Sequence, residues 1–133
     1  MNLNIIILAA GKGKRMHSSL PKVMHKVGGK SMLEHVLISA KKLNPSSINV
    51  VLSPKIESIK KSFGGYDIDW HIQSEQKGTA DAVKIVLPSL KKDEKVLILY
   101  ADTPLIDSNL LDKFINYMPK SDVKVLTVNL EKP

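Results

Sequence analysis

Short apolar runs alternate along this chain with amphipathic segments, and this alternation restricts the possible folds most strongly. The segment from Asn4 to Ala9 is a continuous, isoleucine-rich run, which is typical of a strand buried on both faces of a sheet. Similar runs occupy residues 49–52, 95–100 and 123–128, and a weaker one occupies residues 68–73. Runs of this kind, separated by helical segments, predict an open, mostly parallel sheet.

Segments with helical periodicity lie between these runs. Ser31 is placed to cap a helix that continues to Lys42, and a shorter helix is predicted over residues 56–63. Two further helices are predicted, one over residues 79–90 and one that begins at Ser108. The order of elements predicts one Rossmann-like α/β domain with helices on both faces of the sheet. Ligands of such sheets bind beyond the carboxyl ends of the strands, so functional residues are expected there.

Composition narrows the classes of ligand. The chain has 133 residues and a formal net charge of +7, which favours an anionic ligand. Nucleic acid fits poorly, because the lysines are scattered, the aromatic residues do not interleave with them, and Arg15 is the sole arginine. No apolar run is long enough to cross a bilayer and no basic signal-peptide region is present, so no membrane association is expected. With no cysteine in the sequence, we expect a cytoplasmic protein.

The loop after the first strand combines small, flexible and basic residues. Residues 8–16 read Leu-Ala-Ala-Gly-Lys-Gly-Lys-Arg-Met, so backbone N–H groups and three cations lie close together, as a triphosphate would require. The spacing matches neither a Walker A loop nor a dinucleotide fingerprint. A phosphate-binding loop and a plain glycine-rich turn both fit it. Lys22, stiffened by Pro21, is either a further phosphate partner or a solvated lysine.

Polar residues also follow two later strands. Gln73 can both donate and accept hydrogen bonds, as recognition of a pyrimidine edge requires, and Gly78 permits a ligand to approach the backbone. Thr79 suits the N-cap of the next helix, where its hydroxyl could also face a ligand. Asp102 follows a buried strand, where it either binds Mg²⁺ together with phosphate oxygens or caps the turn that follows.

Taken together, these segments resemble the sugar nucleotidyltransferase superfamily, whose signature is Leu-Ala-Ala-Gly-x-Gly-x-Arg-Met followed by Pro-Lys. The stretches at residues 73–82 and 99–105 narrow the resemblance to the bifunctional N-acetylglucosamine-1-phosphate uridylyltransferase/glucosamine-1-phosphate acetyltransferase family. The resemblance covers essentially the whole chain. It implies that residues 1–133 form the N-terminal, nucleotide-binding part of the uridylyltransferase domain, without the sugar-binding half and the acetyltransferase β-helix.

The resemblance implies a role for each matching residue. Arg15 and Lys22 would be catalytic, because they would neutralise the triphosphate and the transition state, and Asp102 would hold the Mg²⁺. The remaining residues would bind the nucleotide: Leu8, Ala9, Ala10 and Gly11 line the uridine site, Gln73 and Gly78 read uracil, Thr79 lies close to the nucleotide, and Tyr100 and Ala101 flank its sugar.

The implied reaction transfers UMP from UTP to N-acetylglucosamine 1-phosphate. Its products are pyrophosphate and UDP-N-acetylglucosamine, which supplies peptidoglycan synthesis and cell wall biogenesis. Catalysis would consist of charge neutralisation and alignment rather than covalent work by the protein. The resemblance also implies a trimeric parent protein. Without the sugar-binding half, we expect weak UTP binding, little turnover, and self-association through apolar surface that the missing half would cover.

Two departures from the family pattern and two alternatives remain. Ala101 stands where the family usually has glycine, and its methyl group would either crowd the ligand slightly or force a small backbone shift. Lys14 replaces a common threonine. One alternative is a nucleotidyltransferase that uses CTP or GTP, for a sugar phosphate or a cofactor. The other is a nucleotide-binding module without catalysis.

Overall fold

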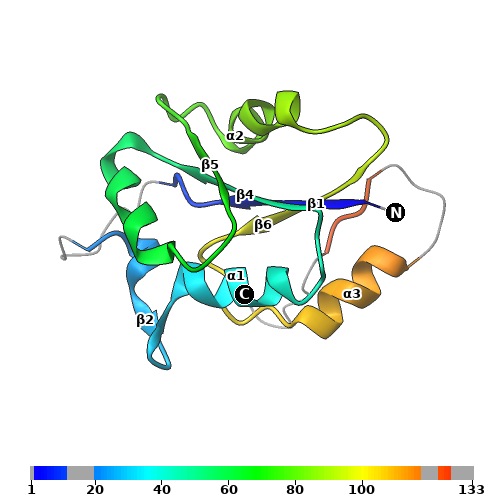
Figure 1. Cartoon of the computed structure of the whole chain (residues 1–133), viewed down its shortest axis with the longest axis horizontal. Helices are drawn as coiled ribbons and strands as arrows, with labels where there is room; N and C mark the ends of the chain where they lie inside the picture. The colour runs from blue at the N-terminus through cyan, green and yellow to red at the C-terminus, as the bar shows by residue number, and fades with distance from the viewer. Residues whose placement is uncertain (1, 12–19, 118–122, 127–133) are drawn as a thin grey trace, which may run out of the picture.

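The computed structural model describes residues 2–11, 20–117 and 123–126. Within these ranges four parallel strands form one sheet in the order β5-β4-β1-β6 (Figure 1). The strands are β1 (Leu3–Leu8), β4 (Ser47–Leu52), β5 (Asp69–Ile72) and β6 (Lys95–Tyr100). The predicted α/β class with a mostly parallel sheet is therefore confirmed.

Helices cover both faces of this sheet, as Figure 1 shows. One face packs against α1 (Met32–Lys41), α3 (Ser108–Asn116) and the 3₁₀ segment η2 (Pro54–Phe63). The other face packs against α2 (Thr79–Val86), which continues into the short 3₁₀ turn η3 (Leu87–Ser89). The central strand β1 faces both layers, so Ile5, Ile6 and Ile7 are all fully buried. This burial explains why the first apolar run has no polar alternation.

Several local predictions hold in detail. The hydroxyl of Ser31 accepts a hydrogen bond from the backbone N–H of Glu34 at 3.2 Å, which makes it the N-cap of α1 as expected. Helix α3 begins at Ser108, and the carboxylate of Asp107 accepts from the N–H of Asn109 at 3.1 Å. Before α1 lie the 3₁₀ turn η1 (Lys22–Met24) and a small antiparallel hairpin of β2 (Lys26–Val27) and β3 (Lys30–Ser31).

Other predictions need correction. The predicted helix at residues 56–63 is instead part of the 3₁₀ segment Pro54–Phe63, which has a kink at Ile56 where the backbone angles are not helical. Helix α2 ends at Val86 instead of residue 90, since Pro88 cannot donate the next helical hydrogen bond. Residues 123–126 form no strand, and Val123 and Val125 are largely exposed, so this apolar run is not part of the sheet. Residues 127–128 of that prediction lie outside the described residues.

Strand β6 also differs from the expectation that both of its faces are buried. Leu97 and Leu99 point into the core, whereas Val96, Ile98 and Tyr100 are 40–47% exposed. The register pairs these three residues with Asn4, Ile6 and Leu8, on the face that α2 covers. Helix α2 therefore shields β1 and β4 but leaves β6 open within the described part of the chain.

None of the described helices combines the length and apolarity needed to cross a bilayer.

Candidate functional site

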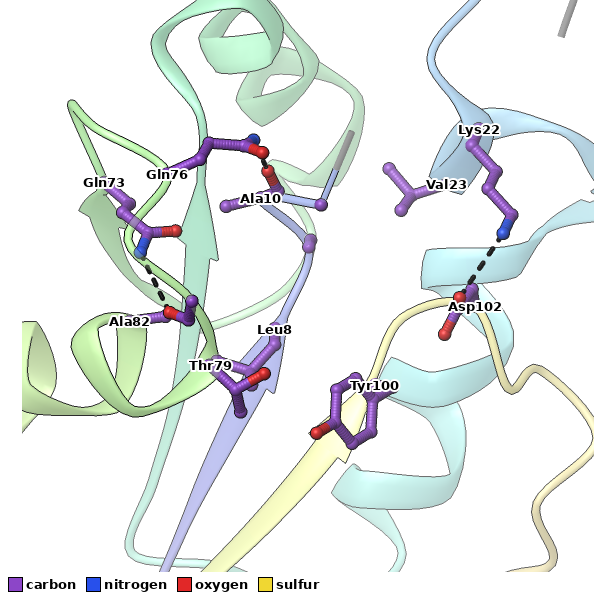
Figure 2. A pocket seen from close by; sticks show the side chains of 13 residues that line it. Leu8, Ala10, Lys22, Val23, Gln73, Gln76, Thr79, Ala82, Tyr100 and Asp102 are labelled. Atoms are coloured by element: carbon purple, nitrogen blue, oxygen red, sulfur yellow. Dashed lines mark hydrogen bonds and ion pairs between the residues drawn. The ribbon is translucent and has the colours of Figure 1, made fainter. Parts of the chain in front are cut away.

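A pocket lies beyond the carboxyl ends of the strands, where the sequence predicted functional residues (Figure 2). Four stretches of the chain form it: the end of β1, the turn η1, the loop after β5 with the start of α2, and the end of β6 with the loop that follows it. Gly11, Lys22 and Asp102, predicted to share one site, all line this pocket. Its complete lining is Leu8, Ala9, Ala10, Gly11, Lys22, Val23, Gln73, Gln76, Gly78, Thr79, Ala82, Tyr100 and Asp102.

Of the remaining predicted site residues, one is not described by the structure and one packs in the core. Arg15, with the rest of residues 12–19, lies outside the described residues. Ala101 is 1% exposed and packs in the core cluster with Leu99 and Leu111, on the face of the sheet that carries α1. Because its methyl group is directed into that core, the expectation that it crowds a ligand finds no support in this geometry.

The end of β1 contributes a tightly held wall of small side chains. Ala9 and Ala10 are 2% and 4% exposed, and the N–H of Ala9 donates to the carbonyl of Val51 at 2.9 Å. The side-chain amide of Gln76 donates to the carbonyl of Ala10, which ties this wall to the loop after β5. Gly11 is not in the left-handed region of backbone angles, so the turn does not demand glycine there on conformational grounds.

The loop after β5 holds Gln73 in one orientation. Gln73 is only 4% exposed, and its backbone N–H donates to the carbonyl of Leu52 at 2.8 Å. The side-chain nitrogen Nε2 donates to the carbonyl of Gly78 at 3.2 Å and to Oδ2 of Asp81 at 3.0 Å. Gln73 is therefore anchored in the pocket wall before any ligand binds.

The start of α2 differs from the prediction by one residue. Gly78, at φ 99° and ψ 177°, is the N-cap, and Thr79 is the first helical residue. The positive φ explains the glycine, because a side chain at this position would strain the backbone. Thr79 therefore does not cap the helix, and it lines the pocket.

The opposite wall carries the charged groups. Nζ of Lys22 lies 3.4 Å from Oδ2 of Asp102, across 80 positions of sequence, and both side chains are nearly half exposed (Figure 2). The turn after β6 is closed by Thr103, whose hydroxyl donates to the carbonyl of Tyr100 at 2.8 Å. The carboxylate of Asp102 is therefore engaged with a pocket cation rather than with the turn that it was a candidate to cap.

The donor set of this wall suits a metal shared with a ligand. Among the described residues no three acidic or histidine side chains gather to hold a metal by themselves. Asp102 offers one carboxylate at the pocket surface, and Mg²⁺ commonly takes one or two carboxylates together with phosphate oxygens and water. The residues present fit a Mg²⁺ that arrives with a nucleotide.

Sequence reasoning missed three lining residues, Val23, Gln76 and Ala82. Val23 and Ala82 follow the periodicity of ordinary core positions, which offers no signal of a site. Gln76 did carry a signal, since it is a polar amide within the predicted ligand loop, but its partner Ala10 lies 66 positions away. A contact of that separation can be identified only in the folded chain.

The chain is similar to known proteins in sequence and in fold. A profile of the MobA-like NTP transferase domain matches residues 5–132. Two proteins named bifunctional protein GlmU, from Idiomarina loihiensis and Stutzerimonas stutzeri, are 44% and 45% identical over 133 residues. The alignments cover 100% of this chain and 29% of each relative, so the chain spans less than a third of their length.

Solved structures show the same fold at lower identity. Rv0371c from Mycobacterium tuberculosis superposes with a TM-score of 0.74 at 16% identity, over 86% of this chain and 59% of that protein. The same protein has also been solved as a complex with manganese, with a TM-score of 0.71.

Proposed function

The chain belongs to the MobA-like NTP transferase domain family, and on that basis we propose that it is the nucleotide-binding part of a uridylyltransferase. The reaction is transfer of UMP from UTP to N-acetylglucosamine 1-phosphate, which gives UDP-N-acetylglucosamine and pyrophosphate. The whole-chain similarity to two GlmU proteins supports this choice of substrates. A cytoplasmic location and a role in supplying cell wall synthesis belong to the same proposal.

One observation carries the proposal most strongly. A neutral, preorganised wall (Ala9, Ala10 and Gln73) and a charged wall (Lys22 and Asp102) face the same pocket. A nucleotide has the same division, with a flat base at one end and phosphates at the other. The small side chains of Ala9 and Ala10 leave room for a base, and the ammonium of Lys22 lies where the phosphates would follow.

The chemistry follows from the charges of the substrates. A phosphate oxygen of the sugar phosphate attacks the α-phosphorus of UTP, a new oxygen–phosphorus bond forms, and the bond to the bridging oxygen breaks so that pyrophosphate leaves. The attacking oxygen is already ionised, so no general base is needed. Both substrates are anions, and the protein contributes by aligning them and by placing positive charge beside the transferred group. Lys22 supplies that charge in the described part of the pocket.

Asp102 would hold the Mg²⁺, which when bound would neutralise phosphate charge. The present ion pair between Lys22 and Asp102 must open for both groups to meet a ligand. Both side chains are nearly half exposed, and exposed pairs of this kind contribute only about 0–1 kcal/mol. Opening this pair therefore costs little compared with the interactions that a triphosphate would make.

Isothermal titration calorimetry tests the proposal directly. In the presence of Mg²⁺ we expect the chain to bind UTP more tightly than CTP, GTP or ATP. Lys22→Ala should weaken UTP binding, because it removes the described cation of the charged wall. Lys55→Ala is a matched control, since Lys55 is exposed and does not line the pocket.

Each alternative gives a different result in this experiment. Tighter binding of CTP or GTP would indicate another nucleotidyltransferase. Selective UTP binding would indicate a binding module if a chimera that supplies the rest of the Idiomarina loihiensis relative also released no pyrophosphate when N-acetylglucosamine 1-phosphate is added. Equal or absent binding of all four nucleotides by a folded sample would contradict the proposal.

A further inference from the structure

Hydrogen bonds to the protein hold the side-chain amide of Gln73 in one orientation. Its nitrogen faces two acceptors, the carbonyl of Gly78 at 3.2 Å and the carboxylate of Asp81 at 3.0 Å. An amide nitrogen has two hydrogens, so the protein itself takes both. Rotation of the amide by half a turn would place its oxygen against two acceptors in a site that is 4% exposed, which is strongly unfavourable.

The consequence is that Gln73 presents only an acceptor to a ligand. In Figure 2 the amide nitrogen of Gln73 points toward its hydrogen-bond acceptor, the carbonyl of Gly78. The amide oxygen points toward the pocket interior and the end of β1. Uracil carries an N–H at ring position 3, which can donate to such an oxygen. Cytosine carries a bare nitrogen at the same position, and that nitrogen is itself an acceptor.

Asp81 stabilises this orientation of the Gln73 amide. It lies in the first turn of α2, where the helix N-terminus favours a carboxylate, and it is three residues beyond the N-cap Gly78. Its hydrogen bond with Gln73 involves an ionised acceptor, which makes it stronger than a bond between neutral groups. Asp81 does not line the pocket, so any effect on the ligand must pass through Gln73.

We infer that Asp81 is a positioning residue for base selection. Its carboxylate holds the amide of Gln73 so that the oxygen faces the nucleotide, and the pocket thereby accepts a base with a ring N–H and rejects cytosine. This inference rests on the proposed function, and it adds the residue that determines which pyrimidine is chosen.

Competitive calorimetry with UTP and CTP tests the inference on the chain as it is. Asp81→Ala frees the amide of Gln73 to rotate, so the ratio of UTP affinity to CTP affinity should fall about tenfold, the value of one hydrogen bond of about 1.4 kcal/mol. UTP should bind less tightly and CTP more tightly. Asp67→Ala is the matched control, because it changes the net charge equally at an exposed position outside the pocket.

Further variants separate positioning from general damage. Asp81→Leu removes the acceptor while keeping the branched arrangement of side-chain heavy atoms, and the ratio should fall in whichever of the two variants folds, as judged by circular dichroism. In a Gln73→Ala background, Asp81→Ala should leave the ratio unchanged, because Asp81 acts only through Gln73. A purely structural role would instead reduce binding of both nucleotides equally in either background.

The wild-type chain provides a measurement that needs no variant. UTP methylated at ring position 3 lacks the donor, so it should bind at least tenfold more weakly than UTP. Equal binding of the methylated nucleotide would overturn the acceptor orientation of Gln73. A wild-type chain without preference for UTP would contradict the proposed function. A wild-type preference that survives both Asp81 substitutions would overturn only the role of Asp81.

Discussion

The two walls of the pocket are built in opposite ways. On the side of Gln73 the polar groups are buried and already hydrogen-bonded to the protein, so little has to move when a ligand binds. On the side of Lys22 the charges are half exposed and paired with each other across 3.4 Å. Under the proposed function, selectivity would reside in the rigid wall, whereas charge neutralisation would reside in the exposed wall whose ion pair can open.

Removal of the cation should produce the largest effect. Lys22→Ala is expected to lower the rate of pyrophosphate release by about 100-fold or more, the typical cost of losing one group that stabilises transition-state charge. The rate can be measured on a chimera that supplies the rest of the Idiomarina loihiensis relative, because this chain without the sugar-binding half is expected to turn over little. A rate within a few-fold of the parent and of Lys55→Ala would show that the charged wall is not catalytic.

A pair of glycine substitutions tests the rigidity of the neutral wall. Gly78→Ala places a side chain at φ 99° and should destabilise the fold by about 1–3 kcal/mol. Gly11→Ala should change stability by less than about 0.5 kcal/mol, because Gly11 avoids positive φ and an added Cβ meets nothing within 4 Å. Urea denaturation of both variants measures the difference. Equal stability losses would mean that the loop at Gly78 is not the constrained one.

Salt should affect the two walls differently. Raising the ionic strength from about 0.01 M to about 0.1 M shortens the Debye length from about 30 Å to about 10 Å, which weakens attraction between exposed charges. UTP binding should therefore weaken several-fold, while binding of uridine, which lacks phosphates, should change little. Calorimetry of both ligands at the two salt concentrations gives the result. If uridine binding weakened as much as UTP binding, the wall that contacts the base would not be neutral as proposed.

The smallest expected effect concerns the support of strand β5, which leads into Gln73. Nε2 of His71 donates to Oδ1 of Asn49 at 3.0 Å, and the amide of Asn49 donates in turn to Ser47 at 3.0 Å. Burial lowers the pKa of His71 below its usual value of 6.5, and the charge of Asp69 opposes this shift. Folding thus favours the neutral ring.

The pH dependence follows from that direction. The stability contributed by neutral His71 is present above the unfolded-state pKa and is lost as the pH falls through the lowered folded-state pKa. Acidification from about pH 7 to about pH 5 should therefore destabilise the wild type slightly more than His71→Gln, because glutamine does not titrate there. Thermal melts of both proteins across this pH range measure the difference. Identical pH profiles would show that His71 does not contribute to the pH dependence of stability.

Local sequence patterns predicted the architecture well because hydrophobic period and helix caps are local properties. The uninterrupted run around Ile6 required a strand with helices on both sides, and Ser31 marked the start of α1. The prediction failed where a neighbour decides the outcome. Residues 123–126 have the composition of a strand but do not form one, and β6 is covered on one face only within the described part of the chain.

Sequence alone determined which chemical groups follow which strands, since the placement of Gly11, Lys22, Gln73 and Asp102 in loops depends on short-range patterning. Tertiary packing alone decided how those groups face one another. The approach of Lys22 to Asp102 and the tie from Gln76 to Ala10 join residues 80 and 66 positions apart. Contacts of such separation arise from how the sheet and helices pack, and no local propensity encodes them.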